Sequence, residues 1–527
     1  MRSFYLVAWA LLAFSGARAG QIPLALSSTT RWNLQDDNAA SWDLDALPSS
    51  NNTSHLLYDT INSLLQHWPN TRYRNGHTLV PGTIPLGMLL YHGTSVPEVP
   101  KVPEWLATDP EHSYIFSLGK EDTGGWHFTF VTTRPLKILY FDGSSAAKVR
   151  GGALDSQDVL LWGKPIPEWT FNERKRIDGL CDWGRKLGLD GFARMEMDFE
   201  IMLCDFSDGL AVVSKLNLPP SMEELPLPPN NTFIVDLPQL MTTALESGWW
   251  HNQYPGDPRI ELDLSRLVSF YDTSLVPSLV PVRHHQQRHE HRLEGISPTD
   301  VKTVREALAL ALNRTGSGSG INWRSIFRII TLRYADRLEL IRYLLNPTEL
   351  EPEIPRSLIE TAKLVQQQLR ISLTPYIING AAPPMVDGDA GARNHSWTAP
   401  IFKYCATTHT NSFIASSSKL TPSEQLILTA IRDTNKEICR VIVKMWAEGV
   451  YEGLDPILRQ PSSSDSESEP SPEALGSLMN RWRVEIDRLF NWLDWSIWIK
   501  CRPACGPEVR HSSVQNAADD PHSVLTL

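Results

Sequence analysis

The apolar pattern of the chain changes character at one place, and this change limits the folds that the chain can adopt. Residues 78 to about 218 contain short apolar runs, such as "LLYHGT", "HFTFVTT", "LKILYFD" and "FEIMLCDF", separated by glycine and proline. Such runs are typical of β-strands. After the proline-rich stretch "LPPSMEELPLPPNN", apolar residues recur at i, i+3 and i+4 over long segments, as in amphipathic helices. We therefore expect an α+β part followed by a mostly α-helical part.

These patterns divide the chain of 527 residues into consecutive segments. Helical spacing over 55–68 precedes the strand-like runs, and helical spacing over 171–188 interrupts them. The segment 461–474 is acidic and of low complexity, which is typical of disorder. In order, we expect a signal peptide over 1–19, a polar lead-in over 20–54, an α+β domain over 55–218, a proline-rich linker over 219–232, a helical domain over 233–460, the acidic segment, a last helix with a cysteine pair over 475–505, and a tail over 506–527.

The N-terminus predicts the compartment. Arg2 is followed by the apolar run "FYLVAWALLAF" and by "SGARAG", which contains an A-x-A cleavage pattern ending at Ala19. This arrangement is typical of a secretory signal peptide. No later stretch approaches the ~18 uninterrupted apolar residues of a membrane helix. We therefore expect a secreted or extracellular protein without a stable membrane anchor.

Glycosylation sequons and cysteines agree with secretion. Cys501 and Cys505 could pair locally in "CRPAC", and Cys181 and Cys204 fall within one expected domain, but the spacing leaves the full pairing open. The sequons lie at Asn51, Asn52, Asn230, Asn313 and Asn394, and the six cysteines are Cys181, Cys204, Cys405, Cys439, Cys501 and Cys505.

Charge and short motifs exclude several classes of function. The net charge is −11 and no broad basic field occurs, so we expect no nucleic-acid partner. The stretch "RHHQQRHEHR" lacks the His-Glu-x-x-His order and its histidines lie among arginines, so we interpret it as a solvated basic loop and predict no metal site. No G-x-S-x-G elbow of a serine hydrolase occurs. The histidines of that stretch are His284, His285, His289 and His291.

Three stretches carry side chains that are suited to chemistry. "LLYHGT" ends a predicted strand with His92, Gly93 and Thr94, and "EWLATDPEHSYIF" contains Trp105 and Tyr114. In "DGFARMEMDFEIMLCDF", a single strand would place three carboxylates on one face. Like charges on one face are costly unless water, a cation or a polar ligand meets them. These carboxylates are Glu196, Asp198 and Glu200.

In this order, the motifs over 78–218 resemble the ADP-ribosyltransferase fold, in the His-Tyr-Glu branch that includes poly-ADP-ribose polymerases and diphtheria-type toxins. The resemblance implies a split β-sheet, NAD as co-substrate and an ADP-ribose acceptor that the sequence does not identify. His92, Gly93 and Thr94 would hold the nicotinamide-side ribose and amide. Glu200 would stabilise the oxocarbenium-like ribose cation, so His92 and Glu200 are the implied catalytic residues.

The middle motif of the family differs here. Where a Tyr-Phe-Ala-Asp-like segment is expected, the chain has Trp-Leu-Ala-Thr-Asp, so the resemblance assigns the stacking position to Trp105. Tyr114 would form a second aromatic wall, and Tyr140 in "LYFDG" is a rival for the same role. The whole chain also resembles a family of secreted fungal proteins of unknown function.

Two other functions remain open at this point. The first is a catalytically inactive binding module that keeps the fold. The second is a chitinase-type glycosidase, because Asp198 and Glu200 resemble the end of its Asp-Gly-x-Asp-x-Asp-x-Glu signature. Four residues, "ARME", interrupt that signature here, and the mostly helical second half does not supply the repeated strand–helix units of a (β/α)₈ barrel.

Overall fold

The part of the chain with a defined structure is discontinuous. The computed structural model describes residues 42–117, 123–196, 198–218, 254–346, 357–384, 394–414, 417–458 and 470–499. The expected signal peptide, the linker, the C-terminal tail, Asn230, Cys501 and Cys505 lie outside these ranges.

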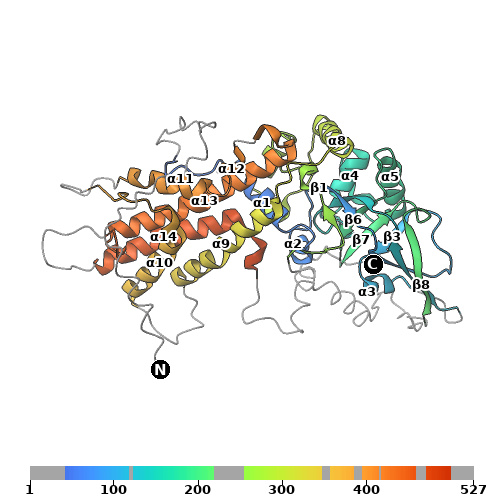
Figure 1. The fold of residues 1–527 in the computed structure, drawn as a ribbon, viewed down its shortest axis with the longest axis horizontal. Coiled ribbons are helices and arrows are strands. Elements are labelled where there is room, and N and C mark those ends of the chain that lie inside the picture. Colours follow the sequence, from blue (N-terminus) through green and yellow to red (C-terminus); the bar gives the residue numbers. More distant parts are fainter. Residues whose placement is uncertain are drawn as a thin grey trace, which may run out of the picture. The chain divides into compact units, whose positions relative to one another are not determined.

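Ten strands form one mixed sheet in the N-terminal part, and a mostly helical region follows, which confirms the α+β expectation (Figure 1). The path is β10-β1-β5-β6-β7-β3-β2-β4-β8, with β9 paired to β1. Among the described strand pairs, only β5 and β6 run parallel. The strands are β1 (Thr78–Ile84), β2 (Leu89–Thr94), β3 (Glu104–Ala107), β4 (Gly125–Thr132), β5 (Leu136–Phe141), β6 (Gly191–Met195), β7 (Phe199–Leu203), β8 (Leu210–Leu218), β9 (Glu261–Leu262) and β10 (Val268–Ser269).

Helices cover one face of this sheet and form its main core. Phe192 and Met202 of the sheet pack in one cluster with residues of α4 (Asp155–Trp162), α5 (Glu173–Arg185) and α8 (Pro298–Asn313). Figure 1 shows α4 and α5 next to each other beside the sheet. Burial of this apolar surface fixes which side of β6 and β7 faces the helices.

The ladder between β2 and β3 is almost absent. Only Tyr91 and Ala107 are paired, whereas β3 pairs with β7 along its whole length. Beyond that point the Nδ1 atom of His92 lies 2.8 Å from the carbonyl oxygen of Trp105, where a backbone bond would otherwise continue the ladder. The two strands therefore leave a gap on the side of α3 (Pro110–Tyr114).

The segment 190–206 differs from the single strand that we expected. It is a hairpin, in which β6 ends at Met195 and β7 begins at Phe199. Glu196 lies in the turn, where its N–H donates to the carbonyl oxygen of Asp198, and the carboxylate of Asp198 accepts from the N–H of Phe199. The three carboxylates therefore do not share one strand face, and only Glu200 projects from a strand.

The helix expected over 55–68 is also divided. α1 (Ser54–Asn62) and α2 (His67–Arg72) are separated at Leu65, which is fully buried and has φ of 62°. Burial of this leucine holds a left-handed conformation that a non-glycine residue rarely adopts.

The remaining helices belong to two compact units, which we describe separately. One comprises 48–339, 416–434 and 490–527, and the other 1–47, 340–415 and 435–489. In the second unit, Trp446 and Trp482 are fully buried, and buried Arg440 binds Glu437 (2.7 Å) and Glu485 (3.2 Å). The remaining α-helices are α7 (Leu279–Arg283), α9 (Trp323–Leu345), α10 (Leu358–Leu373), α11 (Ala399–Thr407), α12 (Asn411–Ile414), α13 (Pro422–Tyr451) and α14 (Pro472–Leu493).

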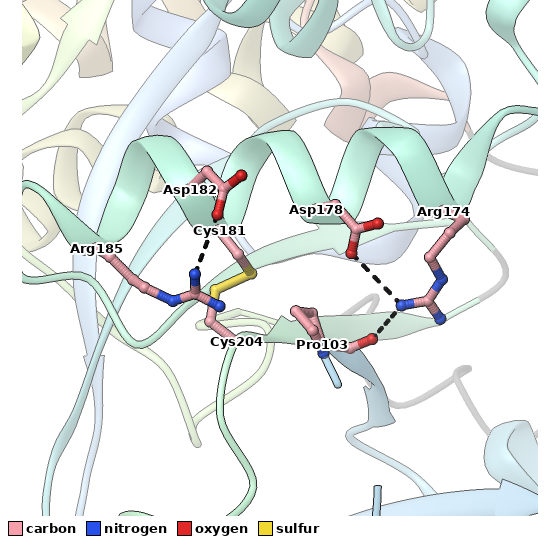
Figure 2. The surroundings of a disulfide bond; sticks show 7 residues. All are labelled: Pro103, Arg174, Asp178, Cys181, Asp182, Arg185 and Cys204. Atoms are coloured by element: carbon pink, nitrogen blue, oxygen red, sulfur yellow. Dashed lines mark hydrogen bonds and ion pairs between the residues drawn. A yellow bond between two sulfur atoms is a disulfide. The ribbon is translucent and has the colours of Figure 1, made fainter. Parts of the chain in front are cut away.

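Two disulfides connect elements within the units. Cys181 of α5 is bonded to Cys204, directly after β7, and Cys405 of α11 is bonded to Cys439 of α13 (Figure 2 shows the first). Disulfides of this kind indicate an oxidising compartment. Among the described residues, no helix combines the length and apolar character needed to cross a lipid bilayer.

Candidate functional site

A cavity of about 340 Å³ opens at the gap between β2 and β3. Its volume is in the range of small-molecule sites. Its lining combines aromatic and apolar residues with acids and bases. The apolar lining includes Trp105, Leu106, Ala107 and Phe116, and the charged or basic groups outside β2 are Glu104, His112, Lys148, Glu173, Arg194 and Glu200.

Glu200 is the carboxylate that faces this cavity from the sheet. It lies directly opposite Arg194 in the β6–β7 ladder, so both side chains project from the same face. The fully buried Arg194 forms ion pairs with Oε1 of Glu200 and with Glu173 of α5. Oε2 of Glu200 has no hydrogen-bond partner in the described part of the chain. Arg194 thus fixes one carboxylate oxygen of Glu200, and the other oxygen is available to contact a ligand.

Carboxylates outnumber cations around the cavity. Arg176 of α5 binds Asp158 and Glu173, so Arg176, Glu173, Arg194 and Glu200 form one chain of alternating charges. Lys148 pairs with Glu196 (2.8 Å). Four carboxylates against three cations leave a net charge of −1 when all are ionised.

The burial of these groups changes their proton affinities. Burial alone would lower the pKa of Lys148, but the carboxylates of Glu200 and Glu196 outweigh burial and raise it. Burial would likewise raise the pKa of Glu173, but Arg194 lowers it. The pKa of Glu196 is raised, because burial outweighs the attraction of Lys148. Lys148 therefore stays a cation in the cavity wall.

His112 of α3 contributes a buried imidazole to the cavity. Its exposed fraction is 2 %, and its Nδ1 has no hydrogen-bond partner within the described ranges. Burial lowers the pKa of His112, and the nearby carboxylate of Glu200 offsets only part of this effect. The imidazole is therefore neutral at neutral pH and can accept a proton.

His92 borders the cavity, but its side chain points elsewhere. Tyr91 is paired with Ala107, and Ala107 with Glu200, so these three residues share a face, and His92 belongs to the opposite face. There its ring contacts Phe128 and Phe206, with centroid distances of 6.4 and 5.8 Å. Burial lowers the pKa of His92, although its bond to the carbonyl oxygen of Trp105 opposes this.

Gly93 is required by the close approach of α3. A Cβ atom at this position would overlap the carbonyl oxygen of Ser113 and crowd the N–H of Ser117. Ser113 is bonded in turn to Nε2 of His127 on β4 (2.7 Å). The glycine thus allows α3 to lie on the strands with His112 toward the cavity.

The other candidates have different surroundings. Thr94 and Tyr114 are half-buried and do not line the cavity, in which the half-exposed Phe116 takes the place of a second aromatic wall. Tyr140 is fully buried, and its hydroxyl accepts from Asn70 (2.8 Å). Sequence reasoning missed Lys148, Glu173, Arg194 and Phe116, because no motif distinguishes them from surface charges and core residues.

The sequons that the structure describes lie at or near the surface. Asn51, Asn313 and Asn394 are exposed, and Asn52 is half-buried, with its side-chain amide donating to Asp433 (2.8 Å). In the described residues, no group of three or more histidine, cysteine, aspartate or glutamate side chains could hold a metal ion.

Fold and site together define an α+β protein with an acid–base cavity at a break in its sheet. Residues 43–127 and 121–238 match a model of the family described as the YPL277C N-terminal domain, a stretch that includes every residue of the cavity. The chain is similar to uncharacterized protein YPL277C of Saccharomyces cerevisiae, with 27% identity over 405 residues, which are 61% of this chain and 81% of that protein.

A second yeast relative is uncharacterized protein YOR389W. It is 26% identical over 398 residues, which are 60% of this chain and 61% of that protein, so the chain spans about three fifths of its length. No solved structure matches the chain significantly.

Proposed function

We propose that the cavity binds the nicotinamide half of NAD and that the protein transfers ADP-ribose from NAD to an acceptor or hydrolyses NAD. The observation that carries this proposal is the carboxylate of Glu200, which lines the cavity with one oxygen fixed by Arg194 and the other unpaired in the described part of the chain. The resemblance of the sequence motifs to ADP-ribosyltransferases supports the same reaction.

The charge of the site suits this chemistry. Breaking the bond between nicotinamide and ribose develops positive charge on the ribose, and a carboxylate that is already in place stabilises that charge without reorganisation. The net charge of −1 around the cavity also favours the cationic pyridinium ring of NAD. Trp105 and Phe116 provide apolar surface for a planar ring.

Release of nicotinamide from NAD by the purified full-length chain tests this function. Glu200→Gln should lower the rate by at least about 10²-fold, because the amide no longer stabilises the cation. Asp182→Asn is the matched control, since it removes an exposed carboxylate of α5 that lies outside the cavity, and its rate should stay within about threefold. Equal rates for wild type and Glu200→Gln would contradict the role of Glu200.

The same preparation distinguishes the inactive binding module. Thermal stabilisation by NAD without turnover would identify a module that has kept the site and lost the reaction. If NAD causes no stabilisation and is not turned over, NAD is rejected as the ligand. A glycosidase is disfavoured, because its barrel requires eight parallel strands and this sheet has one parallel pair among the described strands.

A further inference from the structure

His112 differs from the other basic groups of the cavity because nothing in the described part of the chain occupies its Nδ1. That atom is enclosed, so the ring can meet a water molecule of the cavity only through Nε2, which has no hydrogen-bond partner among the described residues. The ring lies on α3, tilted by 45° against Phe116 at the cavity, and Glu200 is close enough to influence it electrostatically.

We propose that His112 is the general base that activates a water molecule against the ribose, so that the cavity hydrolyses NAD; this inference rests on the proposed function. The bond between ribose C1′ and the nicotinamide nitrogen breaks, and its electron pair neutralises the pyridinium. A bond forms between C1′ and the water oxygen, and the water proton passes to the imidazole of His112. ADP-ribose and nicotinamide leave, and the proton is then released to solvent.

The neighbouring groups are unsuitable for this step. Lys148 is held as an ammonium ion by Glu196 and Glu200, so it has no lone pair to accept a proton. His127 is bonded to Ser113 through Nε2. The ring of His92 belongs to the opposite face of the sheet. His112 is left as a neutral imidazole in the cavity, and Glu200 stays available for the ribose cation.

The roles of His112 and Glu200 can be separated by changing the nucleophile. His112→Ala and His112→Gln should release nicotinamide about 10²–10⁴-fold more slowly than wild type in water. Azide attacks C1′ without losing a proton, so it should restore nicotinamide release by His112→Ala and yield ADP-ribosyl azide. It should not restore Glu200→Gln, in which the cation itself is unsupported. Added imidazole should also rescue His112→Ala in water.

Folding and binding need their own controls. His77 is a fully buried histidine outside this cavity, so His77→Gln measures the cost of removing a buried imidazole and should keep the wild-type rate per folded molecule. Stabilisation of each His112 variant by NAD in a thermal melt establishes that it still binds NAD.

Each outcome decides the question. No nicotinamide release by wild type overturns both the proposed function and the role of His112. Release that Glu200→Gln abolishes but His112→Ala retains overturns only the role of His112. A His112→Ala protein that binds NAD, yet responds to neither azide nor imidazole, also overturns it. Slow release in water with rescue by both reagents supports it.

Discussion

At the scale of single residues, the site depends on Arg194, the buried counterion that Glu173 and Glu200 share. Glu173 reaches it from α5 and Glu200 from β7, and its side chain has no exposed surface. Buried ion pairs contribute little net stability. Removal of one partner is nevertheless destabilising, because the remaining charged group stays buried without compensation. Arg194 therefore fixes the position of Glu200, and its effect on the free energy of unfolding appears only when Arg194 is removed.

Arg194→Met should lower the free energy of unfolding by about 3–5 kcal/mol at pH 7. In the wild type, Arg194 lowers the pKa of Glu173, so this stabilisation is present above the unfolded pKa of about 4.5 and is lost as the pH falls through the folded value. In the variant, Glu173 loses the stronger of its two arginine counterions and keeps only Arg176, so burial raises its pKa relative to the wild type. Its deficit should therefore shrink between pH 7 and pH 4.

Urea denaturation across this pH range measures the effect. Arg185→Met is the matched control, because Arg185 lies on α5 in an exposed pair with Asp182 (3.0 Å; Figure 2). Exposed pairs contribute less than about 1 kcal/mol, so this variant should follow the wild type at each pH. A deficit for Arg194→Met that stayed constant from pH 4 to pH 7 would contradict the charge argument.

At the scale of elements, the site is assembled by contacts that the local sequence does not encode. The strand-like runs predicted β2, β4, β5 and β7, but the turn between β6 and β7 escaped because "RMEMDFE" has no glycine, proline or asparagine to signal it. In that turn, Asp198 accepts from the N–H of Glu196 through its carbonyl oxygen and from the N–H of Phe199 through its carboxylate. Trp105 and Glu200 both line the cavity, whereas the face of His92 depends on register with β3, which spacing along one strand cannot reveal.

The disulfide between Cys181 and Cys204 ties α5 to the end of β7, so it connects the elements that hold Arg194 from two sides. Figure 2 shows it beneath the helix, and Arg174 near the start of that helix donates to the carbonyl oxygen of Pro103. The closed loop of 23 residues corresponds to about 3 kcal/mol of stabilisation through the entropy of the unfolded chain.

Cys181→Ala with Cys204→Ala should therefore lower the free energy of unfolding by about 3 kcal/mol and reduce nicotinamide release, because Glu173 and Glu200 lose a fixed spacing. Cys405→Ala with Cys439→Ala is the control, since that bond lies in the other compact unit. It should destabilise its own unit and leave the rate per folded molecule unchanged. Equal loss of activity in both double variants would argue against a local effect on the cavity.

At the scale of the whole molecule, the order of an α+β part and a helical part was predictable, because the period of the apolar pattern changes from strand-like to helical. The sheet, however, also uses β9 and β10, which follow residue 218 and pair with β1. Long-range pairings of this kind depend on which surfaces remain to be buried after the local elements form. Similarly, Cys405 and Cys439 meet only because α11 packs beside α13.

The compartment is also a property of the whole chain, and glycosylation tests it. Two disulfides indicate an oxidising environment, where the exposed sequons at Asn313 and Asn394 would carry glycans. When the chain is expressed through a eukaryotic secretory pathway, Asn313→Gln and Asn394→Gln should each remove the mass of one glycan. Each should change the free energy of unfolding by less than about 0.5 kcal/mol, because both side chains are at the surface.

Asn346→Gln is the control, because Asn346 is followed by Pro347 and Thr348, and proline in the middle of a sequon prevents glycosylation. Its intact mass should differ from the wild type only by the substitution. A secreted protein whose mass did not change on treatment with an N-glycosidase would contradict the assignment. Free thiols at the described cysteines in that same protein would contradict the oxidising compartment independently, since the Cys181 and Cys439 sulfurs are both bonded in the folded chain.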